Sequence, residues 1–114
     1  MMAAKRLEDQ AEAVAHTKLP AVQKAVVSLQ ASVHKARREV ERTRAEYEHQ
    51  KTLYKTDWST YTAYRESARQ YDEAREALRH AKEALENMSR SFEFWNRRYE
   101  ELLVRAAKAR SGQA

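Results

Sequence analysis

Residues 52–71, TLYKTDWSTYTAYRESARQY, decide the fold of this chain. They hold four of its six tyrosines and one of its two tryptophans, Trp58. The centre of the stretch gathers Asp, Ser and Thr, which are weak helix formers but satisfy free backbone amides where a helix begins. We therefore predict that one helix ends here and another begins, with the tip at residues 57–59 and Ser59 or Thr60 as the cap. The alternative is one continuous helix that dimerises to bury its apolar stripe.

The composition favours helices and leaves little material for turns. The 114 residues include one Gly and one Pro, and 34% of them are charged. Turns use Gly, Pro, Asn and Asp for specific backbone reasons, so only one or two chain reversals can be placed. Abundant Ala, Glu, Arg, Lys and Leu are typical of coiled coils and long helices.

Apolar and aromatic residues recur at alternating steps of three and four from Leu19 onward, as in the seam of a coiled coil. The first series is Leu19, Val22, Val26, Leu29, Val33, Ala36, Val40, Tyr47, Tyr54, Tyr61 and Ala68. The second is Tyr64, Tyr71, Ala74, Leu78, Ala81, Leu85, Met88, Phe92, Trp95, Tyr99, Leu102 and Ala106. Folding at the tip sets Val40 opposite Leu78 and Val22 opposite Trp95. Further out, it sets Val14 opposite Leu102 or Leu103, and Ala11 opposite Ala107.

The predicted fold is all-α, a long antiparallel helical hairpin that forms one coiled-coil domain over residues 1–114. It has an N-terminal helical segment (3–18), a first long helix (20–56), the tip (57–59) and a second long helix (60–110). Pro20 removes one helical hydrogen bond and clashes with the preceding turn, which predicts a kink or a short extra helix at that point. Thr17 would cap a helix that restarts there, and residues 3–18 could fold back as a third helix.

Two groups of apolar residues are candidates for partner contacts. At the tip they are Tyr54, Trp58 and Tyr61, because Tyr and Trp are favoured in interface hot spots. The tyrosines also fit the seam, so packing alone is the competing interpretation. The second group is Val27, Phe94 and Trp95, since residues 26–29 and 92–95 hold more apolar residues than one seam needs, and we expect Val27 and Phe94 to point outward.

Basic residues are unevenly distributed. No acid occurs between Glu12 and Glu39, and the formal net charge of the chain is +5. Candidate contacts for an anionic surface are Lys24, Lys35, Arg37, Arg38, Arg105 and Arg110. A solvated surface that carries no function is the competing interpretation, and no nucleic-acid-binding motif accompanies the charge.

The sequence offers no equipment for catalysis. It has no Cys, no Gly-rich phosphate loop and no nucleophile or metalloprotease motif. Glu46 and His49 have a spacing used in di-iron bundles, but the further ligands of such sites are missing. We therefore expect a protein that is not an enzyme, with no cofactor and no metal.

The leading interpretation is a non-enzymatic coiled-coil structural or adaptor subunit, which binds protein partners within a larger assembly or pairs as a homodimer. One alternative is a basic rod that binds nucleic acid or an anionic surface, which we do not favour. Another follows from layout, because the basic hairpin with a tyrosine-rich middle is similar to the stalk proteins of flagellar and type III export ATPases. No apolar run reaches the ~20 residues of a transmembrane helix. We expect an intracellular protein, in the cytoplasm with the nucleus as the alternative.

Overall fold

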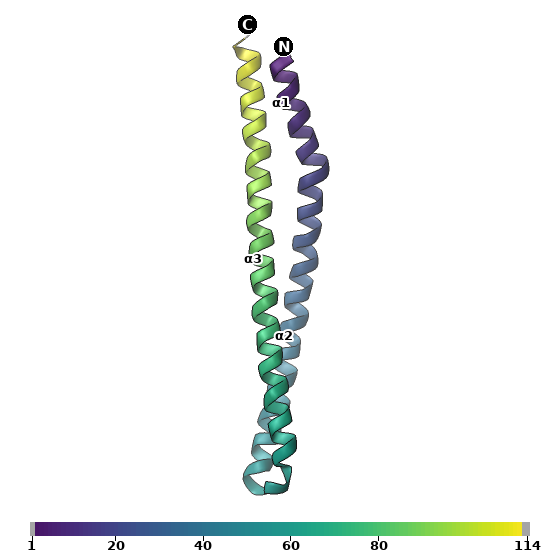
Figure 1. Cartoon of the computed structure of the whole chain (residues 1–114), viewed down its shortest axis with the longest axis vertical. Coiled ribbons are helices and arrows are strands. Elements are labelled where there is room, and N and C mark those ends of the chain that lie inside the picture. The colour runs from purple at the N-terminus through teal and green to yellow at the C-terminus, as the bar shows by residue number, and fades with distance from the viewer. Residues whose placement is uncertain (1, 113–114) are drawn as a thin grey trace. The chain divides into compact units, whose positions relative to one another are not determined.

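The computed structural model describes residues 2–112, and helices account for nearly all of them. Helix α1 spans Met2–Ala13, a π-helical turn spans Val14–Lys18, and α2 spans Leu19–Thr56. A 3-10 turn, Trp58–Thr60, leads into α3, Tyr61–Ser111 (Figure 1). The residues described contain no strand. The prediction of an all-α helical hairpin is confirmed.

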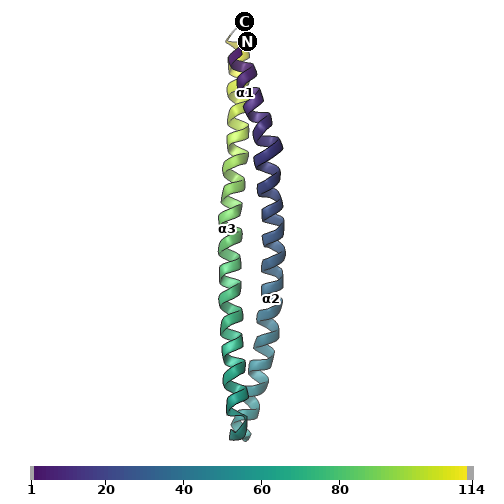
Figure 2. The ribbon, with the colours of Figure 1, turned by 45° about the vertical axis from the view of Figure 1, so that its right-hand side comes forward.

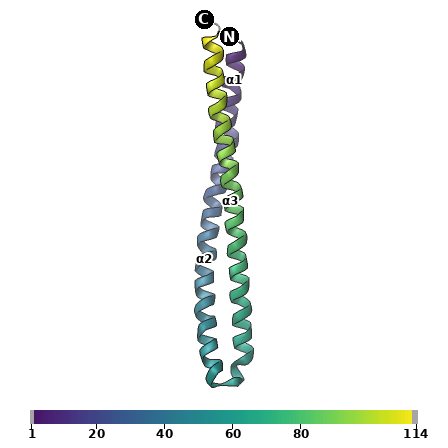
Figure 3. The same ribbon diagram turned by 90° about the vertical axis from the view of Figure 1, so that its left-hand side faces the viewer.

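The chain divides into two compact units. The tip unit consists of Leu29–Leu85, and the terminal unit consists of Met1–Ser28 and Glu86–Ala114. In the tip unit, α2 and α3 run antiparallel and are joined by the turn (Figure 3). In the terminal unit, α1 and the first turns of α2 run antiparallel to the last part of α3 (Figures 1 and 2). Both units therefore bury one apolar seam between two helices.

The turn is built around Asp57. Its backbone is extended, with φ −143° and ψ 102°, and its carboxylate accepts hydrogen bonds from the Ser59 amide (3.0 Å) and the Ser59 hydroxyl (2.6 Å). Its carbonyl accepts the amide of Thr60 (3.1 Å), while its own amide donates to the carbonyl of Leu53 (2.9 Å). The predicted caps, Ser59 and Thr60, are wrong: the acceptor must precede the free amides, and Asp57 does so. None of the described residues has a positive φ, so the turn needs no Gly.

Asp57→Asn is expected to remove a pH dependence from stability while keeping the cap. The hydrogen bonds from Ser59 hold the pKa of Asp57 below its usual value. A lowered folded-state pKa contributes stability above the unfolded pKa, about 3.9, and this contribution is lost as the pH falls through the folded value. Thermal melts between pH 2 and 7 should show the native chain losing stability relative to Asp57→Asn below about pH 4. Parallel curves for the two proteins would contradict this role.

The seam of the tip unit alternates tyrosines with small buried residues. Thr43 and Ser67 are only 3% and 5% exposed. Tyr47 contacts both Tyr64 and Tyr71, so its ring lies between them, at the level of Ser67. The predicted seam position Ala68 is wrong, because Ser67 is the more deeply buried residue; with Ser67 the steps from Tyr64 to Ala74 stay regular. The rings fit because the facing positions are small.

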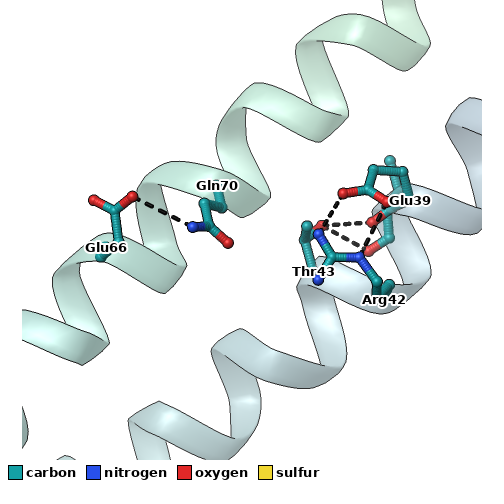
Figure 4. Close-up of polar contacts among 6 residues, drawn as sticks. Glu39, Arg42, Thr43, Glu66 and Gln70 are labelled. Carbon is teal, nitrogen blue, oxygen red and sulfur yellow. Dashed lines mark hydrogen bonds and ion pairs between the residues drawn. The ribbon is translucent and has the colours of Figure 1, made fainter.

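The two buried hydroxyls are satisfied within their own helices. Thr43 Oγ1 donates to the carbonyls of Glu39 (2.8 Å) and Val40 (3.1 Å) (Figure 4). Ser67 Oγ donates to the carbonyl of Tyr64 (2.7 Å). A buried hydroxyl without a partner would be costly. These hydrogen bonds form within one helix, so they do not depend on the facing helix. The polar seam positions therefore carry little penalty.

The helix continues through the region of Pro20. The predicted restart and the folded-back third helix are wrong, because α1, the π-helical turn and α2 follow one another without a break. The predicted irregularity takes the form of the π-helical turn, in which the amide of Leu19 bonds to the carbonyl of Val14. Thr17 caps no new helix, since its hydroxyl donates back to the carbonyl of Ala13.

The π-helical turn corrects the phase of the seam. Ala4, Ala11 and Val14 are buried and Leu7 is half-buried, at steps of three and four, but the next seam residue after Val14 is Leu19, five positions on. A regular helix would place exposed Lys18 in the seam instead. A π turn holds one extra residue and so absorbs the offset.

The core of the terminal unit confirms one predicted pairing and corrects another. Ala11, Val14 and Leu102 form its buried cluster, against which Leu7, Leu19, Trp95 and Tyr99 pack. Val14 and Leu102 belong to the same cluster, as their predicted pairing requires. Ala11 also lies with Leu102, whereas its predicted partner Ala107 is exposed.

Candidate interaction sites

Trp58 is the most exposed aromatic residue of the tip unit. It begins the 3-10 turn, is 82% exposed and, within the described chain, contacts no other ring. The hydrogen bonds of Asp57 fix the backbone on either side of it. The indole of Trp58 therefore projects from an ordered turn and packs against no other ring of the described residues.

The two tyrosines predicted to join Trp58 belong to a continuous ring stack. The Tyr54 ring lies parallel to that of Tyr64, with 5.1 Å between centroids, and the centroid of Tyr61 is 5.5 Å from that of Tyr54. Tyr54 is half-buried, and Tyr61 remains 46% exposed. Tyr54 is thus a packing residue. Tyr61 contacts Tyr54, and the part of its ring that faces solvent could contact a partner.

Further from the tip, two cations lie over tyrosine rings and a hydrogen bond joins two of the tyrosines. Lys51 lies 6.0 Å from the ring centroid of Tyr47, and Arg75 lies 5.4 Å from that of Tyr71. A hydrogen bond with Tyr64 is the main cause of a raised pKa at Tyr47. These contacts stabilise the seam. They agree with the interpretation that the tyrosines serve packing.

The terminal unit exposes two of its three predicted contact residues. Phe94 is 61% exposed and Val27 is 58% exposed, so both point outward as predicted. Trp95 is half-buried in the seam, with Lys18 Nζ 5.4 Å from its ring centroid, and serves packing. Its ring meets Phe94 edge-on, with 5.2 Å between centroids. Val27 lies on α2 and Phe94 on α3, so the two come from different helices.

Sequence reasoning missed three further exposed aliphatic residues. They are Leu53 in the tip unit, and Leu103 and Val104 in the terminal unit, with exposures of 37%, 42% and 54%. Their positions lie off the three-and-four spacing of the seam, and that spacing would have identified them.

The predicted basic contacts are divided between the units. Lys24, Arg105 and Arg110 belong to the terminal unit, and Lys35, Arg37 and Arg38 belong to the tip unit. All six are exposed. Arg110 forms an ion pair with Glu8 on α1, so it links the two helices of the terminal unit. The other five form no ion pair with any residue from 2 to 112, which leaves them available to an anion.

The described residues contain no group of three or more His, Asp or Glu side chains that could hold a metal ion. Between residues 2 and 112, no helix combines the length and apolar character needed to cross a membrane. Comparisons with protein-family models, curated proteins and solved structures gave no match.

Proposed function

We propose that this chain is a structural or adaptor subunit that binds a protein partner within a larger assembly, and that Phe94 is central to the contact. The supporting observation is the 61% exposure of Phe94 beside a seam that is complete without it. Within the described hairpin its ring contacts only that of Trp95, edge-on, and most of its surface stays in water. Against a partner it would bury a large apolar surface.

The residues one turn along α3 strengthen the proposal. Arg97 and Arg98 follow Phe94 at spacings of three and four, so they lie on the same side of the helix. Neither forms an ion pair within residues 2–112. Aromatic residues and arginine are enriched in the hot spots of protein interfaces, which is the combination found here.

A photo-crosslinking residue at position 94 is expected to give one dominant adduct in the cells that produce the protein. The same residue at position 96 provides the matched control, because Asn96 is also exposed on α3. An adduct of twice the chain mass would identify a homodimer, and any other mass a different subunit. Phe94→Glu should remove the native assembly peak in size-exclusion chromatography with light scattering, and Asn96→Glu should not. Equal behaviour of the two positions would contradict the proposal.

The basic alternative stays a second proposal. Its support is the acid-free stretch of the first helical arm between Glu12 and Glu39, with Lys35, Arg37 and Arg38 unpaired among residues 2–112. Binding of this kind depends steeply on salt, which separates it from a contact centred on Phe94. No observation specifically favours the stalk-like regulator.

A further inference from the structure

The turn of the tip unit combines one protruding indole with a basic surround. Trp58 is 82% exposed, and the two nearest exposed apolar side chains in sequence, Leu53 and Tyr61, are 37% and 46% exposed. The turn lies where α2 passes into α3, at the end of the tip unit (Figure 3). Because Trp58 is already exposed, it could insert into a deformable surface without any rearrangement of the hairpin.

The charge around this turn is positive. Between Glu48 and Glu66 the sole acid is Asp57, whereas Lys51, Lys55 and Arg65 are cations. None of these three forms an ion pair with a residue from 2 to 112. The carboxylate of Asp57 is engaged by the amide and hydroxyl of Ser59, and it lies at the start of the next helix, where the helix dipole offsets negative charge.

We propose that the tip is a lipid-contact site: Trp58 enters the interface of an anionic bilayer, and the exposed Lys55 and Arg65 bind its headgroups. Trp and Tyr concentrate at membrane–water interfaces because their rings combine an apolar body with a polar edge. Lys and Arg extend long apolar stems and keep their charge in the headgroup layer. Cations near an anionic leaflet add attraction that falls off within the Debye length.

A protein pocket fits this turn less well. A stable protein interface buries about 800 Å² on each partner. The exposed apolar residues here are Leu53, Trp58 and Tyr61, on a convex turn. Leu53 and Tyr61 are only partly exposed, and the Tyr61 ring already contacts that of Tyr54. A deformable, negatively charged surface can surround such a turn without a preformed cavity. The site is independent of Phe94, which lies in the terminal unit.

The test uses vesicles of phosphatidylcholine with 30% phosphatidylglycerol, and pure phosphatidylcholine vesicles for comparison. In a Trp95→Phe protein, Trp58 is the remaining tryptophan. Its emission should shift to the blue and gain protection from acrylamide with the anionic vesicles only. Vesicle sedimentation of the native protein gives the same answer if Trp95→Phe fails to fold. Trp58→Ser should lose sedimentation, with its helix content by circular dichroism unchanged.

Charge variants test the headgroup contact. Lys55→Gln should weaken the partition coefficient about fivefold, whereas Lys82→Gln should leave it unchanged, because Lys82 is exposed in the same unit but lies far along α3 from the turn. Phe94→Glu should also leave the partition coefficient unchanged. The vesicle assay therefore tests the lipid site independently of the protein contact proposed at Phe94. No binding to anionic vesicles, equal binding to pure phosphatidylcholine, or a crosslink from position 58 to a protein alone would overturn the lipid site.

Discussion

Leu102→Ala is expected to lower the free energy of unfolding by about 2–5 kcal/mol. Leu102 is 1% exposed and is the one large side chain among the described residues that is fully buried. It packs against Ala11 and Val14, which are too small to close the space that truncation would leave. Urea denaturation followed by circular dichroism measures the loss.

Leu103→Ala is the matched control, because it removes the same atoms one position along the helix. Leu103 is 42% exposed and lies outside the buried cluster. Its truncation should change stability by no more than about 1 kcal/mol, near the usual range for surface substitutions. Equal losses at the two positions would show that the seam of the terminal unit is not formed as described.

Deletion of His34 is expected to cost more than about 3 kcal/mol, whereas deletion of His16 in a Pro20→Ala background should be tolerated. Both histidines are exposed. Removing one residue from a regular helix rotates all preceding residues by about 100°, which takes Val33 and the earlier seam residues off their face. Several apolar side chains lose burial, each worth about 1.5–3 kcal/mol.

Deleting His16 has the opposite consequence, because it shortens the five-residue step from Val14 to Leu19 to four. The π turn would then become regular α-helix with the seam intact. The Pro20→Ala change is needed since proline inside a regular helix costs about 3 kcal/mol. Pro20→Ala alone should keep the π turn, which the seam requires. Urea melts of the three variants test this explanation, and it fails if the two deletions destabilise equally.

The helices, the antiparallel fold and the place of the turn could be predicted because they follow from local properties. The three-and-four spacing determines which face of a helix is apolar, and the cluster around Asp57 marks where the first helix ends. The spacing alone does not determine the relative position of the two helices. Two regular stripes match at every heptad, so the register depends on how tyrosines fit against small residues such as Thr43 and Ser67.

The candidate sites were predictable to a smaller extent. Spacing alone indicated that Val27 and Phe94 lie off the seam, and both are exposed. It did not separate Tyr54 and Trp95, which pack inside the fold, from Trp58, which does not. Residue type is the same for a packed and an exposed aromatic, and only the three-dimensional neighbours distinguish them. Partner identity is further removed, since no motif with a defined chemistry is present.

The distribution of ion pairs implies an order of folding. Among residues 2–112, each pair joins residues three or four apart on one helix, except that between Glu8 and Arg110. The local pairs can support nascent helices before the arms meet. Glu8 and Arg110 are 102 positions apart, and closing so long a loop first is entropically unfavourable. Helix pairing that begins beside the turn shortens the loop that each later contact must close. The two helices should therefore pair progressively from Asp57 outward, with the Glu8–Arg110 contact among the last to form.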